Sequence, residues 1–209
     1  SLPDEDVLNI AGIKQKDYFF IVNENEIKNR LESYPLIKRA EVEKVFPNSL
    51  HINLFERKPL AMTLVSSNEG PIPVVFDDEG IIFQIGSSIT NWDIPVISGI
   101  RFADVRLGIQ LPKELRSLLK DLKNIKDTSP ALFNAVSELK LVKGSGADFE
   151  VLMYPARCSI PVRIGSELTE HLLKYIMMVL DVMAKEEFMQ KIEEIDFRTG
   201  EIVYKVKEE

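Results

Sequence analysis

Apolar residues near the start of the chain recur at helical spacing. Pro3 suits the first position of a helix and is followed by acidic residues that suit the positive end of a helix dipole, so a short helix is predicted over residues 3–11, ended by Gly12. A second helix is predicted between an N-cap at Asn25 and a stop at Pro35. Its apolar face consists of Ile27, Leu31 and Tyr34.

The spacing of apolar residues then changes to alternation, which is typical of strands with one buried face. The first such run covers residues 38–46, and its inward positions are Ala40, Val42 and Phe46. The second run alternates Leu50, Ile52 and Leu54 with His51, Asn53 and Phe55. A turn at residues 47–49 separates the two runs, so we expect these strands to pair antiparallel.

Further short apolar runs predict a strand-rich second part. The expected strands span residues 60–65, 74–76, 81–85, 94–99, 136–142, 148–153 and 159–164. A tight, solvent-facing turn is expected at residues 77–80. Two amphipathic helices are also predicted, one opened by Pro112 and running to Ile125, and a longer one capped by Ser166 and running to Met183.

The last two strands, residues 192–198 and 202–206, are predicted to form a hairpin. The final strand would lie at a sheet edge, where unpaired backbone groups can accept a partner strand and Ile202 and Tyr204 would supply selectivity. The alternative is an edge that charged residues protect from other chains. Those residues are Lys205, Lys207, Glu208 and Glu209.

The early strands end at Glu56–Pro59, and this segment is the expected domain boundary. The predicted fold class is α+β. A small domain over residues 1–59 is followed by a larger mixed α/β domain over residues 60–209, with an antiparallel meandering sheet and a C-terminal hairpin.

The composition of the 209-residue chain, 45% apolar and 28% charged, is that of an ordinary globular protein. Its net charge of −7 argues against nucleic acid as a partner, because an acidic protein repels phosphate backbones. The longest apolar run, residues 176–184, has nine residues and contains Asp181, so it is too short to span a membrane. Cys158 is the only cysteine, so no disulfide can form within the chain.

The residues that usually carry catalysis or bind metals form no recognisable pattern. The spacing of His51 and His171 suggests no shared metal site, and Cys158 lacks a C-x-x-C partner. The acidic residues 77–79 lack the frame of a calcium-binding loop. The methionines near the C-terminus could form an adaptable partner groove or continue the core face of their helix; they are Met177, Met178, Met183 and Met189. We expect no catalytic residue, no cofactor and no metal.

Several short motifs, in order and spacing, resemble the FtsQ/DivIB family of bacterial cell-division proteins. They are Asp4-Glu5-Asp6-Val7, Phe19-Phe20-Ile21-Val22-Asn23, Pro35–Val42, Phe46–Ile52, Glu56–Ala61, Phe76–Phe83, Ile94–Gly99 and Ile195-Asp196-Phe197-Arg198. The resemblance extends over nearly the whole chain.

The resemblance implies a POTRA domain over residues 1–59, with its first strand missing or truncated, and a β domain over residues 60–209. Members of the family cross the cytoplasmic membrane once. The present segment is similar to their extracytoplasmic part, which lies at the division septum. A membrane connection would then run only through an N-terminal helix absent from this segment.

For function, the resemblance implies a non-catalytic scaffold that recruits FtsB/DivIC-like and FtsL-like division proteins through the end of the β domain. The implied partner-binding residues are Ile195, Phe197, Arg198, Ile202 and Tyr204. Arg198 matches a family arginine, for which a bond to a partner carboxylate and an ion pair with Asp196 are alternatives. Other division proteins could bind the POTRA domain.

Two other function classes remain open at this point. The first is a POTRA module of an outer-membrane assembly or polypeptide-transport factor, which would bind unfolded strands. The second is a hydrolase that uses acidic residues, which requires a carboxylate pair in a pocket. Nothing in the sequence locates such a pair.

Overall fold

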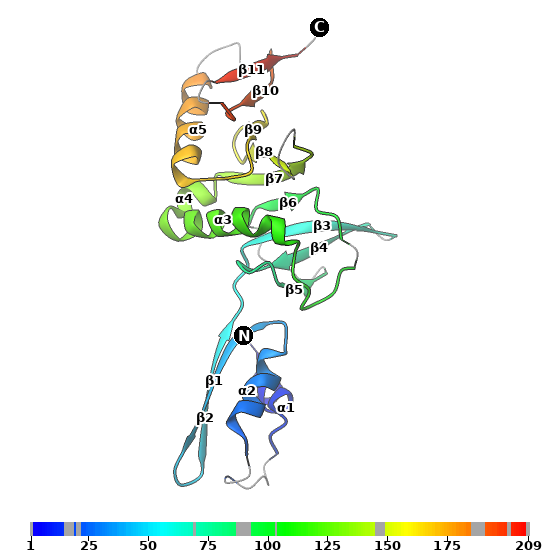
Figure 1. Cartoon of the computed structure of the whole chain (residues 1–209), viewed down its shortest axis with the longest axis vertical. Coiled ribbons are helices and arrows are strands. Elements are labelled where there is room, and N and C mark those ends of the chain that lie inside the picture. Colours follow the sequence, from blue (N-terminus) through cyan, green and yellow to red (C-terminus); the bar gives the residue numbers. More distant parts are fainter. Residues whose placement is uncertain are drawn as a thin grey trace. The chain divides into compact units, whose positions relative to one another are not determined.

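The computed structural model describes residues 2–14, 19, 22–68, 70–86, 93–102, 104–144, 149–184, 191–199 and 202–207. The chain divides into two compact units, Ser1–Lys58 and Pro59–Glu209. Figure 1 shows the elements of each unit.

The first unit consists of two helices followed by a two-stranded ribbon. Its elements are α1 (Asp4–Ala11), α2 (Glu24–Glu32), β1 (Ile37–Val45) and β2 (Ser49–Glu56). As predicted, α1 ends at Gly12, whose φ of 69° lies in the left-handed region that glycine adopts most easily. Pro3, predicted as the first helical residue, is instead the N-cap.

The start and the end of α2 differ from the prediction. Its N-cap is Asn23, whose side chain accepts hydrogen bonds from the backbone N–H groups of Asn25 and Glu26. Asn25 is therefore the second helical residue, and the prediction that it caps the helix was wrong. Tyr34 lies beyond the helix and is exposed, because α2 ends before the turn that leads into β1.

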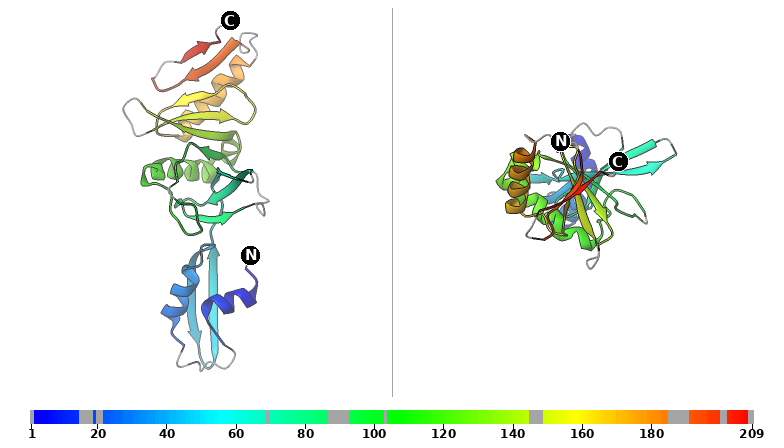
Figure 2. Two further views of the ribbon diagram at one scale, coloured as in Figure 1. Left: turned by 90° about the vertical axis from the view of Figure 1, so that its right-hand side faces the viewer. Right: turned by 90° about the horizontal axis from the view of Figure 1, so that it is seen from above.

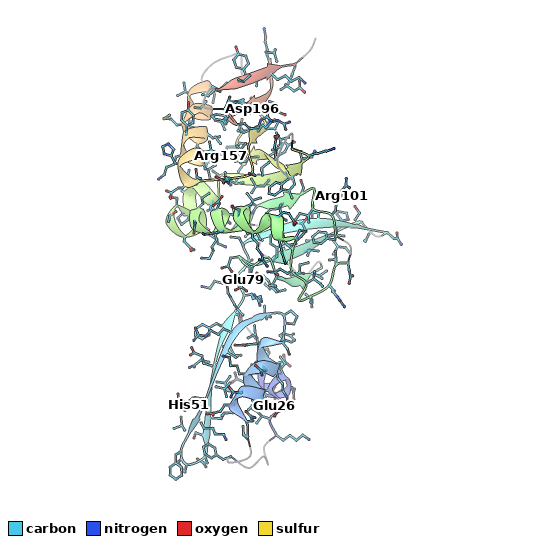
Figure 3. The ribbon with its side chains drawn as sticks, viewed as in Figure 1. Glu26, His51, Glu79, Arg101, Arg157 and Asp196 are labelled. Carbon is cyan, nitrogen blue, oxygen red and sulfur yellow. The ribbon has the colours of Figure 1, made fainter. Side chains whose placement is uncertain are left out.

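The core of the first unit lies between the helices and one face of the β1–β2 ribbon. Buried residues from both layers form it: Ala11, Ile27, Leu31, Ile37 and Ala40. The alternating residues Leu50, Ile52 and Leu54 of β2 pack against this core as predicted, and His51 lies on the face of the ribbon away from the helices (Figure 3). Phe46, which was predicted to point inward, is 80% exposed because β1 ends at Val45.

In the described part of the second unit, nine strands form one sheet in the order β11-β10-β9-β8-β7-β6-β3-β4-β5. The strands are β3 (Ala61–Ser67), β4 (Gly70–Phe76), β5 (Ile82–Ile85), β6 (Val96–Ser98), β7 (Val136–Val142), β8 (Glu150–Pro155), β9 (Val162–Ile164), β10 (Ile192–Asp196) and β11 (Val203–Val206). The fold class α+β is confirmed.

The sheet is mixed and not antiparallel throughout. β6 lies between β3 and β7 and is parallel to both, and β10 is parallel to β9. Helices connect two of these parallel pairs, with α3 and α4 between β6 and β7 and α5 between β9 and β10. The prediction of a simple meander missed this arrangement, because a crossover helix allows consecutive strands to run in the same direction.

The helices of the second unit lie along the same face of its sheet (Figures 1 and 2). They are α3 (Arg116–Thr128), preceded by the 3-10 turn η1 (Lys113–Leu115), α4 (Pro130–Phe133) and α5 (Glu170–Met183). The cap of α5 is Thr169, whose side chain accepts a hydrogen bond from Leu172 N–H, and not Ser166 as predicted. The helix therefore begins later than its apolar pattern suggested, and Leu168 is buried in the segment before it.

The turn between β4 and β5 contains a buried carboxylate. Asp77 is fully buried, and its Oδ1 accepts hydrogen bonds from Glu79 N–H at 3.0 Å and Ile81 N–H at 2.9 Å. The prediction of a solvent-facing acidic turn was therefore wrong for Asp77. This side chain holds the turn by bonding its backbone, which is a common role of aspartate in turns.

Candidate partner-binding edge

β11 lies at the edge of the sheet, with β10 as its neighbour in the described part of the chain. The two strands pair antiparallel, with Ile195 opposite Tyr204 and Asp196 opposite Val203. Beyond the strand, the backbone N–H of Lys207 donates to Lys191 O at 2.8 Å. Because N–H directions alternate along a strand, the N–H of Val206 points away from β10.

The side chains of β11 are exposed on both of its faces. Apolar residues dominate, with exposed fractions of 54% for Val203, 52% for Tyr204 and 48% for Val206, while the preceding Ile202 is 36% exposed. Edge strands are usually protected by charge, proline or a covering element. An exposed apolar edge strand is therefore suited to pairing with another chain.

The charged residues near this edge protect it only in part. Lys205 is directed to its own neighbouring strand, with its Nζ 2.8 Å from Glu193 Oε2. Lys207 is exposed, and Glu208 and Glu209 lie outside the described residues. An ion pair within the hairpin leaves the apolar side chains of β11 accessible.

Two of the five residues named from the family resemblance are buried. Ile195 is fully buried and Phe197 is 8% exposed. The ring of Phe197 meets the ring of Tyr175 on α5 edge to face, with centroids 5.7 Å apart. These two residues therefore attach the hairpin to the body of the second unit, and a partner would reach them only through their exposed neighbours.

Arg198 is bonded to two carboxylates of its own chain. Its Nη1 lies 3.0 Å from each carboxylate oxygen of Glu150, at the start of β8. Its Nε and Nη2 donate to Asp196, the latter at 2.6 Å from Oδ2. The intrachain ion pair with Asp196 is therefore formed, and Glu150 adds a second acceptor.

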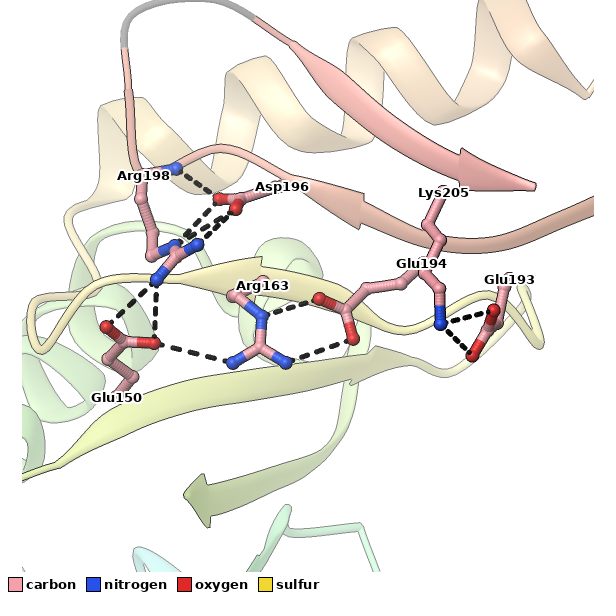
Figure 4. A network of polar contacts seen from close by, with 7 residues as sticks. All are labelled: Glu150, Arg163, Glu193, Glu194, Asp196, Arg198 and Lys205. Atoms are coloured by element: carbon pink, nitrogen blue, oxygen red, sulfur yellow. Dashed lines mark hydrogen bonds and ion pairs between the residues drawn. The ribbon is translucent and has the colours of Figure 1, made fainter. Parts of the chain in front are cut away.

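This contact belongs to a charged cluster of five residues that crosses β8, β9 and β10 (Figure 4): Glu150, Arg163, Glu194, Asp196 and Arg198. Arg163 on β9 lies at its centre, with Nη2 3.1 Å from Glu194 Oε2 and Nη1 3.4 Å from Glu150 Oε2. Three carboxylates and two guanidinium groups leave one net negative charge. The cluster therefore offers no net attraction for a partner carboxylate.

The contacts within the charged cluster favour the ionised forms of Asp196, Arg163 and Arg198. Hydrogen bonds from Arg198 lower the pKa of Asp196. The pKa of Arg198 is raised, first by its hydrogen bonds to Asp196 and then by those to Glu150, and the bond to Glu194 raises the pKa of Arg163. Glu150, Arg163 and Glu194 were not singled out from the sequence, because their contacts depend on the order of three strands.

The outer face of α5 adds apolar surface to the same end of the sheet. Met178 is 56% exposed and Val182 is 60% exposed, and they lie four residues apart on one face of the helix. Core packing was the other expectation for the methionines, and Met178 does not follow it. Met189 lies outside the described residues.

Other kinds of site have little support in the described part of the chain. No group of three or more His, Cys, Asp or Glu residues there could hold a metal ion, and His51 and His171 belong to different units. No helix among the described residues combines the length and apolar character that a membrane crossing requires.

Comparisons with known proteins agree with the motifs. A family model described as "POTRA domain, FtsQ-type" matches residues 1–57. The chain is 27% identical over 167 residues to a cell division protein FtsQ of Geotalea daltonii, covering 79% of this chain and 58% of that protein. It is 28% identical over 103 residues to a cell division protein DivIB of Geobacillus kaustophilus, covering 49% of this chain and 38% of that protein.

The similar proteins include some named FtsQ and some named DivIB. A cell division protein DivIB of Clostridium acetobutylicum is 21% identical over 117 residues, covering 56% of this chain and 45% of that protein. The match thus covers little more than half the length of the Geotalea daltonii protein and less than half of each DivIB protein. These matches agree with the resemblance found in the sequence motifs: the chain is similar to the FtsQ/DivIB family of bacterial cell-division proteins, and residues 1–57 match its FtsQ-type POTRA domain.

Proposed function

We propose that this chain is the extracytoplasmic part of a single-pass membrane protein that acts as a non-catalytic scaffold in cell division. Its task would be to bind FtsB/DivIC-like and FtsL-like partners at the septum through β11 and the outer face of α5. The observation that carries the proposal is the exposed apolar edge strand, together with the similarity of the chain to FtsQ and DivIB proteins. Further division proteins could bind the first unit, Ser1–Lys58, which we call the POTRA unit after the family model that matches it.

Strand addition is the mode of binding that this edge favours. A partner strand would bond the outward backbone groups of β11, such as the N–H of Val206, and so extend the sheet. Side chains on both faces of β11 would then contribute selectivity, with Tyr204 on one face and Val203 on the other. The exposed apolar residues of α5 would be covered by a segment of the partner next to the added strand.

The family resemblance implies that Arg198 binds a partner directly. This proposal gives it a role within its own chain. Both its carboxylate partners lie within its own chain, and they hold the end of β10 against β8. We assign Arg198 a positioning role, in which it fixes the loop that leads into β11. Direct recognition would come mainly from the backbone and the apolar side chains of β11.

Proline substitution at β11 tests strand addition directly. Val206→Pro removes an N–H that points away from β10, so it blocks an added strand and keeps the bonds to β10. Val206→Ala is the matched control, because it shortens the side chain and keeps the N–H. Binding would be measured by calorimetry with the soluble segment of an FtsB/DivIC-like protein.

We expect Val206→Pro to weaken binding by about tenfold or more, since a lost hydrogen bond and a steric block act together. Val206→Ala should weaken binding by only about threefold, because it removes two methyl groups that the partner would bury only in part. A proline variant that binds as tightly as the native chain would exclude strand addition at β11. Equal recovery of the partner by a chain truncated after Arg198 would exclude the hairpin altogether.

A further inference from the structure

The outer edge of β1, the edge away from β2, is bonded by side chains of the neighbouring helix. The backbone N–H of Lys44 donates to Glu24 Oε1 at 2.7 Å, and the N–H of Ala40 donates to Glu32 Oε1 at 3.0 Å. Glu24 and Glu32 are the first and last residues of α2. We call them the edge-capping glutamates.

The register of the ribbon explains why these two N–H groups are available. Ala40, Val42 and Lys44 are opposite Leu54, Ile52 and Leu50 of β2. Residues at alternate positions direct their N–H groups to the same side of a strand. Since Ala40 and Lys44 donate to α2, the outer edge of β1 carries the N–H groups of the even-numbered residues.

The helix and the strand have matching lengths at this edge. Glu24 and Glu32 are eight positions apart, which in a helix corresponds to about 12 Å. Ala40 and Lys44 are four positions apart, which in a strand corresponds to about 13 Å. Lys28 lies between the two glutamates on the same flank and pairs with Glu32 at 3.9 Å.

The edge-capping glutamates occupy the positions that an added strand would need. In strand addition, carbonyl oxygens of the incoming chain accept the outward N–H groups of the edge. Here carboxylate oxygens accept two of them, and a bond to a charged acceptor is stronger than one to a neutral carbonyl. An incoming strand would have to displace both side chains and would meet their negative charge.

We propose that α2 closes the β1 edge of the POTRA unit to strand addition through the edge-capping glutamates. The edge strands β1 and β11 thereby differ, since β11 carries exposed apolar residues whereas two outward N–H groups of β1 are bonded by α2. Strand addition to the first unit is thereby disfavoured at its β1 edge. This inference concerns the first unit alone and does not depend on binding at β11.

Two double variants of the full chain separate the role of the acceptor from that of the charge. Glu24→Ala/Glu32→Ala removes both acceptors, whereas Glu24→Gln/Glu32→Gln keeps an amide oxygen that can accept each N–H. Glu5→Ala/Glu43→Ala is the matched control, because both residues are exposed and the change in net charge is the same. Hydrogen exchange would report on the amides of Ala40 and Lys44.

The probe for an open edge is a fluorescein-labelled peptide that copies β2, Ser49–Glu56, with a scrambled peptide as its control. Fluorescence anisotropy should detect micromolar binding of the β2 peptide to the alanine variant, at least tenfold tighter than to the native chain, the glutamine variant or the Glu5/Glu43 control. Exchange at Ala40 and Lys44 should be at least tenfold faster in the alanine variant alone.

Unchanged exchange at these two amides in the alanine variant would overturn the proposal. Faster exchange without peptide binding would overturn it as well. The N–H groups of the β1 edge would then be released, and the edge would still not bind an added strand. Loss of binding at β11 changes neither the exchange at Ala40 and Lys44 nor the binding of the β2 peptide. Failure of the proposed function and failure of this inference are therefore distinguishable.

Discussion

Arg198 Nη1 lies 3.0 Å from both carboxylate oxygens of Glu150, a residue 48 positions earlier in the chain. Glu150 is 8% exposed, so the pair is largely shielded from water on the side of the carboxylate. The contact ties the end of β10 to the start of β8 across β9. Together with the bonds of Arg163 to Glu194, it joins side chains of the C-terminal hairpin to β8 and β9 (Figure 4).

Glu150→Gln should loosen the C-terminal hairpin. The change leaves two guanidinium groups beside a neutral amide, and breaking a shielded charge pair of this kind costs about 1–3 kcal/mol of unfolding free energy. Urea unfolding would measure the loss, and hydrogen exchange should be faster in β10 and β11 than in β3 and β4. Glu193→Gln is the control, because its exposed pair with Lys205 contributes less than about 1 kcal/mol. Equal losses in the two variants would contradict a special role for Glu150.

The Glu170 carboxylate should stabilise the fold in a pH-dependent way. It pairs with Lys174 at 2.6 Å and accepts hydrogen bonds from Ser129 and Thr128. These contacts, the one to Lys174 first, lower its pKa from 4.5 to about 2. Because the pKa is lower in the folded state than in the unfolded state, the stabilisation is fully present above pH 4.5 and is lost as the pH falls towards 2.

The measurement compares the urea midpoints of the native chain and Glu170→Gln over this range. The native chain should have the higher midpoint at pH 6, and the difference should disappear near pH 2. Glu167→Gln, at an exposed position before α5, is the control for the same change in net charge. A difference that stays constant with pH would contradict the assignment.

Asn23→Ala should destabilise the first unit by about 1 kcal/mol, because the Asn23 side chain satisfies two backbone N–H groups at the start of α2. Asn25→Ala should be neutral or slightly stabilising, since residue 25 is helical and alanine is the better helix former. Thermal unfolding followed by circular dichroism would compare the two. A larger loss for Asn25→Ala would restore the sequence-based assignment of the cap.

Gly80→Ala should destabilise the turn between β4 and β5. Gly80 has a φ of 74°, where other residues are strained by about 1–2 kcal/mol. An added Cβ would also lie 3.1 Å from Leu119 Cδ1 and 3.3 Å from Leu111 Cβ. Gly165→Ala is the control, since a Cβ there meets nothing within 4 Å. Similar unfolding free energies for the two variants would contradict the role of the left-handed turn.

The elements with a clear periodic pattern were largely predictable from the sequence. The alternation of Leu50, Ile52 and Leu54 predicted both β2 and its buried face, and the apolar spacing up to Ile125 predicted the core side of α3. These signals are local, because they depend only on which side of an element contacts the core. Helix caps were less predictable, since several polar residues near a helix start can accept the same N–H groups.

The candidate site was predictable only in part. That the chain ends in a hairpin follows from its alternating residues, and the motifs indicate the family. Other features follow only from the tertiary structure. They are the burial of Ile195 and Phe197, the exposure of all of β11 and the ion pair between Arg198 and Glu150. These features arise where strands distant in the sequence become neighbours.

The sequence by itself determined the kinds of element, their order and the resemblance to a family, because side-chain periodicity and short motifs are properties of adjacent residues. The tertiary structure alone decided which edges are open. An edge is open or closed according to what lies beside it, and the glutamates that bond β1 and the carboxylates that hold Arg198 come from other segments of the chain.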